Sequence, residues 1–183
     1  MLEQEMKIPV PSLTPVREAL ARAGGELQQP ETFEDNSVLD DDARSLAVSG
    51  RLLRLRRAGK TNLLTFKGPA RFAAGVKTRS EFESAVTDGE QVLAILAALG
   101  FRQVRRYQKR RETWQLRAIT VALDTTPVGC FVELEGEGGA LAAAAASLGL
   151  EPSSAVRGTY LDLWTSYRAV HPEAPADMVF ADT

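Results

Sequence analysis

The chain has 183 residues, of which 44% are hydrophobic and 25% charged, and this suits a single domain with a substantial core. The 22 Lys and Arg against 24 Asp and Glu leave a formal net charge of −2, so overall charge gives no reason to expect nucleic acid or a membrane as partner. The single cysteine excludes an intrachain disulfide, no apolar run nears the roughly 20 residues that span a bilayer, and the charged N-terminus lacks a signal-peptide core, so we expect a cytoplasmic protein.

Residues 1–8 alternate between uncharged and charged side chains, which predicts a strand. The charged positions Glu3, Glu5 and Lys7 share one face of that strand. Thr14-Pro15 predicts the start of a helix that two glycines end after Ala23. The polar stretch that follows, residues 26–39, is expected to be extended.

Charged alternation recurs in the next part of the chain. Strands are predicted over residues 52–56, 62–67 and 79–83, the first two joined by a hairpin at 58–60. In the first of these strands Arg54 and Arg56 share a face, opposite to leucines. Asp88 then predicts the cap of a helix that runs through Leu99, with Val92, Leu93, Leu96 and Leu99 available for burial.

The C-terminal half continues this mixture. Further strands are predicted over residues 101–116, 118–123 and 130–137, and helices over 140–148 and 160–168. In the first of these strands Arg105, Tyr107, Lys109 and Arg111 share one face. No linker divides the chain, so residues 1–170 are predicted to form one α+β domain rich in antiparallel strands. Residues 171–183 contain two prolines and are expected to be a loosely ordered tail.

The charged strand faces hold seven acids and seven bases. They are Glu3, Glu5, Glu81, Glu83, Asp124, Glu133 and Glu135 against Lys7, Arg54, Arg56, Lys67, Arg79, Lys109 and Arg111. A sheet needs one face for its core, so the other face either meets solvent or lines a closed tunnel. Inside a tunnel, converging Arg and Lys suit phosphate oxygens, and paired carboxylates suit Mg²⁺ or Mn²⁺. The pattern therefore indicates a polyphosphate and metal site, with a solvated sheet as the alternative.

The motifs resemble the CYTH superfamily, the triphosphate tunnel metalloenzymes. Glu3-x-Glu5-x-Lys7 is similar to the family's ExExK signature at the N-terminus. The remaining pieces follow in the family's order: Leu53-Arg54-Leu55-Arg56, Thr65-Phe66-Lys67-Gly68, Arg79-x-Glu81-x-Glu83, Lys109-x-Arg111, Asp124, Gly129 to Glu135, and Thr159 to Leu163. The chain departs from the family in the strand before the first arginine pair, where Asn36 and Val38 replace an expected aromatic.

The resemblance implies a fold and roles for the charged residues. The fold is an eight-stranded antiparallel barrel with flanking helices, whose tunnel holds a triphosphate and one or two Mg²⁺ or Mn²⁺ ions. The signature residues Glu3, Glu5 and Lys7 are expected to be catalytic. Phosphate is expected to be held by Lys7, Arg54, Arg56, Lys67 and Arg111, with Arg79 and Lys109 as further contacts. Metal ligation, directly or through water, is expected of Glu3, Glu5, Asp124, Glu133 and Glu135, while Glu81 and Glu83 are placed in the tunnel without a fixed role.

Three functions remain open from the sequence. The first is a metal-dependent phosphohydrolase that cleaves a phosphoanhydride of inorganic triphosphate, thiamine triphosphate or a nucleoside triphosphate. The second is a class IV adenylate cyclase, which needs the same triphosphate cradle, and the third is a non-catalytic polyphosphate-binding module. Gly136-x-Gly138-Gly139 resembles a dinucleotide loop but lacks the third glycine and the βαβ context. The expected partner is a triphosphorylated small molecule, bound by a monomer or homodimer.

Overall fold

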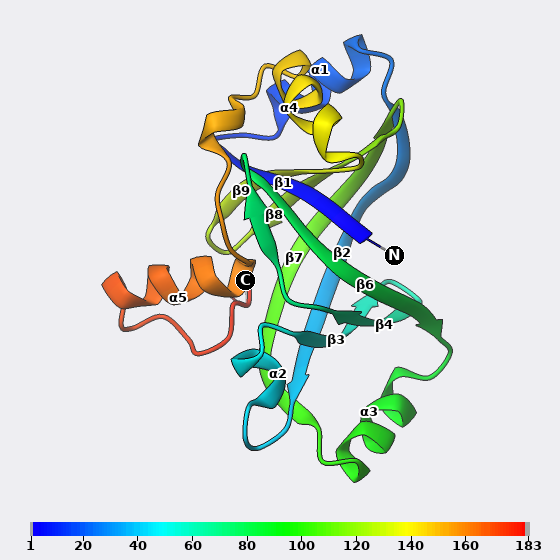
Figure 1. Ribbon diagram of the computed structural model, residues 1–183, viewed down its shortest axis with the longest axis vertical. Coiled ribbons are helices and arrows are strands. Elements are labelled where there is room, and N and C mark those ends of the chain that lie inside the picture. The colour runs from blue at the N-terminus through cyan, green and yellow to red at the C-terminus, as the bar shows by residue number, and fades with distance from the viewer. Residues whose placement is uncertain (1, 182–183) are drawn as a thin grey trace.

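A computed structural model describes residues 2–181 of the chain (Figure 1). The strands are β1 (Leu2–Val10), β2 (Glu26–Asp40), β3 (Leu52–Ala58), β4 (Thr61–Lys67), β5 (Arg71–Ala73), β6 (Val76–Val86), β7 (Arg102–Leu116), β8 (Ile119–Thr126) and β9 (Gly129–Glu135). The helices are α1 (Thr14–Arg22), α2 (Ser45–Val48), α3 (Gly89–Ala98), α4 (Gly138–Ser147) and α5 (Tyr160–Val170), with a 3-10 turn, η1, at Pro152–Ser154. Met1, the first residue of the predicted N-terminal strand, lies outside the described residues.

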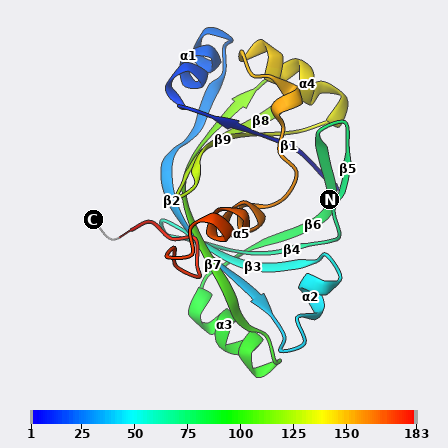
Figure 2. The same cartoon turned by 90° about the vertical axis from the view of Figure 1, so that its left-hand side faces the viewer.

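The strands form a closed antiparallel barrel, which confirms the predicted fold. Eight strands follow one another in the order β1-β9-β8-β7-β2-β3-β4-β6, and β1 also pairs with β6 to close the ring. The closing strand uses its two halves for its two neighbours: Leu2–Glu5 pair with β6, and Glu5–Val10 pair with β9. The ninth strand, β5, is a short addition at the edge of β6. Figure 2 shows the strands curving around a central space that α5 partly crosses.

The main hydrophobic core lies outside the barrel. On β1 the side chains of Met6 and Ile8 are 1% and 2% exposed and pack outward, because alternate residues of a strand point to opposite faces. Helices α1 and α4 cover this outer face through Leu20 and Leu141, among others (Figure 1). The barrel interior is thereby left to the charged side chains of the same strands.

The helices begin and end close to the predicted positions. Pro15 lies in the first turn of α1, where a missing backbone N–H costs nothing. The Asp88 side chain accepts a hydrogen bond from the Gln91 backbone and caps α3. The burial predicted for Leu99 is wrong, because this side chain is 68% exposed at the end of α3. Within residues 2–181, no helix combines the length and the apolar character required to cross a membrane.

The C-terminal segment has defined contacts, although its composition predicts loose order. Met178 is fully buried, and its backbone exchanges hydrogen bonds with Arg106 and Gln108 of β7. The Trp164 indole of α5 donates to the carbonyls of Pro175 and Ala176. Residues 174–181 therefore fasten α5 to the barrel wall, while residues 182–183 lie outside the described part of the chain.

Candidate active site

The charged strand faces line one cavity of about 390 Å³ inside the barrel. Fourteen of its nineteen lining residues are charged, eight as cations and six as carboxylates. The lining residues are Glu3, Glu5, Lys7, Leu52, Arg54, Arg56, Lys67, Lys77, Arg79, Glu81, Glu83, Tyr107, Lys109, Arg111, Glu133, Glu135, Thr159, Tyr160 and Leu161. All predicted site residues except Asp124 are among them, so the tunnel interpretation replaces the solvated sheet.

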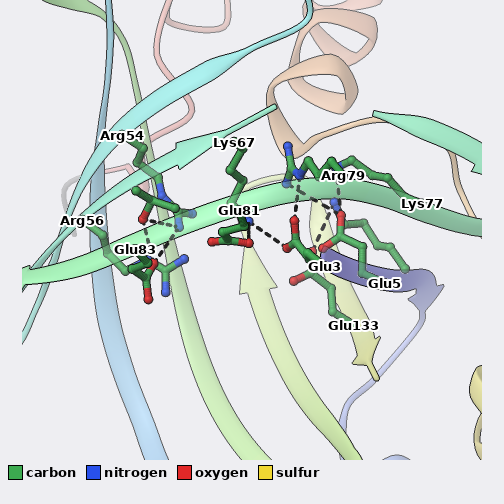
Figure 3. A network of polar contacts seen from close by, with 12 residues as sticks. Glu3, Glu5, Arg54, Arg56, Lys67, Lys77, Arg79, Glu81, Glu83 and Glu133 are labelled. Atoms are coloured by element: carbon green, nitrogen blue, oxygen red, sulfur yellow. Dashed lines mark hydrogen bonds and ion pairs between the residues drawn. The ribbon is translucent and has the colours of Figure 1, made fainter. Parts of the chain in front are cut away.

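The N-terminal signature residues are held by cations from β4 and β6. Glu3 accepts from Lys67 Nζ at 2.8 Å and from Arg79 Nε at 2.7 Å. Glu5 accepts from Lys77 Nζ at 2.8 Å, and burial lowers the pKa of Lys77 even though Glu5 opposes that shift. Figure 3 shows these side chains converging where β1 lies beside β6. The antiparallel register that pairs Glu3 with Arg79 and Glu5 with Lys77 produces this alternation of charge.

A second group of cations comes from β3. Arg54 donates through Nη1 to the Tyr107 hydroxyl at 2.9 Å and through Nη2 to Thr65 at 3.2 Å, and it lies 3.6 Å from a Glu83 oxygen. Arg56 donates to Asn36 at 3.3 Å. In Figure 3 Arg54, Arg56 and Glu83 lie apart from the group around Glu3. The cavity therefore has two cationic centres, one formed by β3 and β7 and one formed by β4 and β6.

Asp124 lies behind the cavity wall and anchors cations. It is fully buried, accepts from Arg111 through both carboxylate oxygens at 2.7 and 2.5 Å, and also accepts from Lys109 at 3.1 Å and from the Tyr160 hydroxyl at 2.6 Å. With its oxygens engaged in this way, Asp124 positions phosphate-binding candidates. The metal-ligand role expected of Asp124 stays a prediction.

Glu133 shares these cations. It contacts Arg111 and lies 3.2 Å from Lys7, whose ammonium sits 3.9 Å from the centre of the Tyr160 ring. Burial would raise the pKa of Glu133, but Arg111, Lys7 and Lys109 outweigh it and hold that pKa well below its ordinary value. These cations therefore favour the ionised form of Glu133.

Glu34 of β2 is a buried carboxylate that sequence reasoning missed. It is 4% exposed and lies 3.3 Å from Arg56 and 3.6 Å from Lys109. Burial would raise its pKa, yet the surrounding cations, led by Lys109 and Arg111, lower the pKa to about 2. The signal was present in the sequence, because Glu34 and Asn36 continue the period-two alternation of polar residues.

Glu135 differs from the other carboxylates. The residue as a whole is exposed at the edge of the cavity, but its carboxyl group is partly buried. The pKa of Glu135 is raised first by this burial and then by Glu3, Glu81 and Glu5, against a lowering effect of Lys67. Within residues 2–181, no three acidic, His or Cys side chains form a ready-made metal site. The excess of negative charge around Glu135 nevertheless suits a hard divalent cation, since carboxylate oxygens are its preferred ligands. The donor set fits Mg²⁺ or Mn²⁺.

Further residues of the site were not predicted. Lys77 precedes Arg79 by two residues and continues the period-two alternation of that strand, so the sequence could have predicted that Lys77 faces the tunnel. Tyr107 was expected on the face of Lys109 but was given no role, and Tyr160 was noted only as part of a helix. Leu52, Thr159 and Leu161 also line the cavity, all near α5 or the start of β3.

The fold and the cavity define a closed barrel with a charged tunnel. A family model described as the CYTH domain matches residues 1–160, and the chain belongs to this family. A Methanocaldococcus jannaschii protein described as a candidate adenylate cyclase is 29% identical over 136 residues, which are 74% of this chain and 77% of the relative.

Two solved structures have the same fold. A candidate adenylate cyclase of Vibrio parahaemolyticus has a TM-score of 0.81 at 18% identity and covers 90% of this chain and 98% of its own. A Hippeastrum protein has a TM-score of 0.68 at 17% identity and covers 90% of this chain and 96% of its own. It is described as an adenylyl cyclase candidate with a dominant triphosphatase activity. At these identities the likeness concerns the fold.

Proposed function

We propose that the protein is a metal-dependent phosphohydrolase that cleaves a phosphoanhydride bond of a triphosphorylated substrate inside the barrel. The observation that carries this proposal is the composition of the cavity lining, with eight cations and six carboxylates around one enclosed volume. The five uncharged lining residues are Leu52, Tyr107, Thr159, Tyr160 and Leu161. Such a lining suits a phosphate chain better than a purine ring, which favours hydrolysis over cyclisation.

The charge balance explains why a metal belongs in the proposal. Glu34 and Asp124 stand behind the wall and bring the carboxylates to eight, equal to the number of cations. A triphosphate that enters this formally neutral network brings several negative charges with it. A divalent cation near Glu3, Glu5 and Glu135 would compensate part of them and would supply electrophilic activation of the phosphoryl group.

The residues of the chain have separate tasks in this proposal. The cations of the two centres, together with Lys7 of β1, hold the phosphate oxygens and stabilise the charge that develops as the anhydride bond breaks and the bond to the attacking water forms. They are Lys7, Arg54, Arg56, Lys67, Arg79, Lys109 and Arg111. Charge-assisted bonds from Arg are forked and fix the orientation of the phosphoryl group, while Lys supplies a point charge. Glu3 and Glu5 hold Lys67, Arg79 and Lys77 in place before the substrate arrives.

A substrate panel tests the proposal. Inorganic triphosphate, thiamine triphosphate and ATP are each incubated with Mg²⁺ or Mn²⁺, and orthophosphate, pyrophosphate and cyclic AMP are measured in parallel. We expect metal-dependent release of orthophosphate. Cyclic AMP and pyrophosphate formed from ATP would establish the cyclase reaction that the description of the M. jannaschii relative favours. Tight binding without turnover of any substrate would establish the non-catalytic module.

A further inference from the structure

Tyr107 brings a neutral hydroxyl into the cationic centre formed by β3 and β7. Its side chain is 7% exposed and lines the cavity. A phenol has one hydrogen-bond donor besides its acceptor lone pairs. Arg54 Nη1 donates to the oxygen at 2.9 Å and so occupies a lone pair, which leaves the proton for another partner.

In the described part of the chain the hydroxyl makes no hydrogen bond as a donor, although Glu34 Oε2, a buried acceptor without a hydrogen-bond partner, belongs to the same cationic centre. Within residues 2–181, no protein group accepts the Tyr107 proton. The charged side chains that act on it most strongly are Arg54, Lys109 and Arg56, which are donors without lone pairs. The Arg54 Nε atom is likewise buried without a hydrogen-bond partner. Buried donors are normally satisfied, so these two indicate a ligand acceptor at this point.

The phenol is also held in place before a ligand arrives. Its ring packs in a cluster with Val38, Phe131, Trp164 and Met178. The backbone carbonyl of Tyr107 accepts from the Asn36 side chain at 3.3 Å, and the neighbouring residues of β7 bond to the segment around Met178. A group fixed by packing on one side and by hydrogen bonds on the other loses little freedom on binding.

We propose that the Tyr107 hydroxyl contacts the bound triphosphate directly and donates a hydrogen bond to a phosphoryl oxygen that Arg54 also holds. The inference rests on the proposed function, because it places the triphosphate in this cavity. The cations around the phenol lower its pKa against the opposing effect of burial, which makes it a stronger donor to an anionic oxygen. Tyr107 is thus a neutral contact in a site whose predicted phosphate contacts are all charged.

Binding of diimidotriphosphate, a triphosphate analogue whose bridging nitrogens resist hydrolysis, tests this contact by calorimetry in Mg²⁺. Tyr107→Phe keeps the packed ring and removes only the hydroxyl, so the fold without ligand should keep its melting temperature. We expect the analogue to bind roughly tenfold or more weakly, as for a lost hydrogen bond to a charged group. The matched control is Tyr167→Phe on α5, where the tyrosine is 37% exposed and the affinity should stay unchanged.

A double-mutant cycle separates contact from positioning, because the phenol also supports Arg54. If Tyr107 touches the ligand, Tyr107→Phe still weakens binding severalfold in an Arg54→Ala background. If the hydroxyl only positions Arg54, the second substitution has no further effect and the inference is overturned. Equal binding by wild type and Tyr107→Phe overturns it as well. No binding of the analogue by wild-type protein would instead refute the proposed function itself.

Discussion

The substitution Glu34→Gln separates the stability of the empty tunnel from its affinity for a polyanion. Glu34 lies among Arg56, Lys109, Arg111 and Arg54, and its pKa of about 2 records how strongly they favour its charge. The shift from 4.5 to about 2 corresponds to about 3 kcal/mol, at about 1.4 kcal/mol per pKa unit. We therefore expect Glu34→Gln to lower the free energy of unfolding at pH 7 by up to about 3 kcal/mol.

The same substitution should tighten ligand binding. The cations that Glu34 neutralises become available to phosphate when its charge is removed. For a phosphate placed roughly 8 Å from Glu34, with an effective dielectric of about 20, the carboxylate charge and one phosphate charge would repel by about 2 kcal/mol. Affinity for a triphosphate analogue should therefore rise by roughly tenfold or more, while stability falls. A residue that serves only packing would not move these two quantities in opposite directions.

The dependence on pH follows from the sign of the shift. A depressed pKa in the folded state means that the stabilisation by Glu34 is fully present above the ordinary pKa of 4.5 and is lost as the pH falls through about 2. Chemical denaturation of wild type and Glu34→Gln between pH 7 and pH 2.5 should show a difference that shrinks below pH 4.5. Glu31→Gln, on the same strand in an exposed pair with Arg110, is the control and should change stability by at most about 0.5 kcal/mol. A constant difference across this range, or weaker ligand binding, would refute the reasoning.

Three further predictions concern the other parts of the molecule. Lys67→Ala should weaken triphosphate binding by about 1.5–3 kcal/mol in calorimetry, and equal affinity of this variant and wild type would contradict the role of Lys67. Glu135→Gln, in contrast, should slow phosphate release with little change in melting temperature. Removing divalent cations with a chelator should abolish turnover and leave the circular dichroism spectrum and the melting curve intact, since the core lies outside the barrel; unfolding on chelation would show that the metal is structural. Leu141→Ala, at a fully buried position of α4, should cost about 2–5 kcal/mol of stability but leave triphosphate affinity unchanged. A loss of affinity in the folded variant would contradict the view that the outer core and the tunnel site are independent.

The strand alternation predicted much of the site because the barrel preserves it. Glu3, Arg54 and Glu133 lie on the interior faces that their period assigns them, with apolar neighbours outside. The alternation ends where the register shifts. Arg105 shares the face of Tyr107 and pairs with Val38, yet its side chain is exposed, and directly beyond this pair, between Val38 and Leu39, the pairing of β2 with β7 slips by one residue. Such an irregularity depends on tertiary pairing and leaves no mark in the local sequence.

The sequence also could not predict how deeply each charged side chain lies within the barrel wall. Glu133 and Asp124 both carry carboxylates on interior faces, but one lines the cavity and the other lies fully buried beneath Arg111 and Tyr160. Residue spacing gives the face of a strand and not the distance of a side chain from the axis. Glu133→Gln removes the charge that contacts Arg111 and Lys7, so this substitution should reduce the free energy of unfolding more than Glu135→Gln does. The positions of the two residues in the sequence do not by themselves indicate this difference.

The closing strand joins the formation of the site to the formation of the fold. Glu5 is the point at which β1 passes from one neighbour to the other, because it pairs with Lys77 of β6 and with Glu135 of β9. A shift of β1 by one residue would turn its carboxylates out of the tunnel and bring Met6 and Ile8 inside, at the cost of the outer core. The apolar face of β1 therefore fixes the register that places Glu3 and Glu5 beside their cations. Because the outer core fixes this register, the tunnel residues can be arranged for a ligand, as the balanced cations and carboxylates of the tunnel indicate.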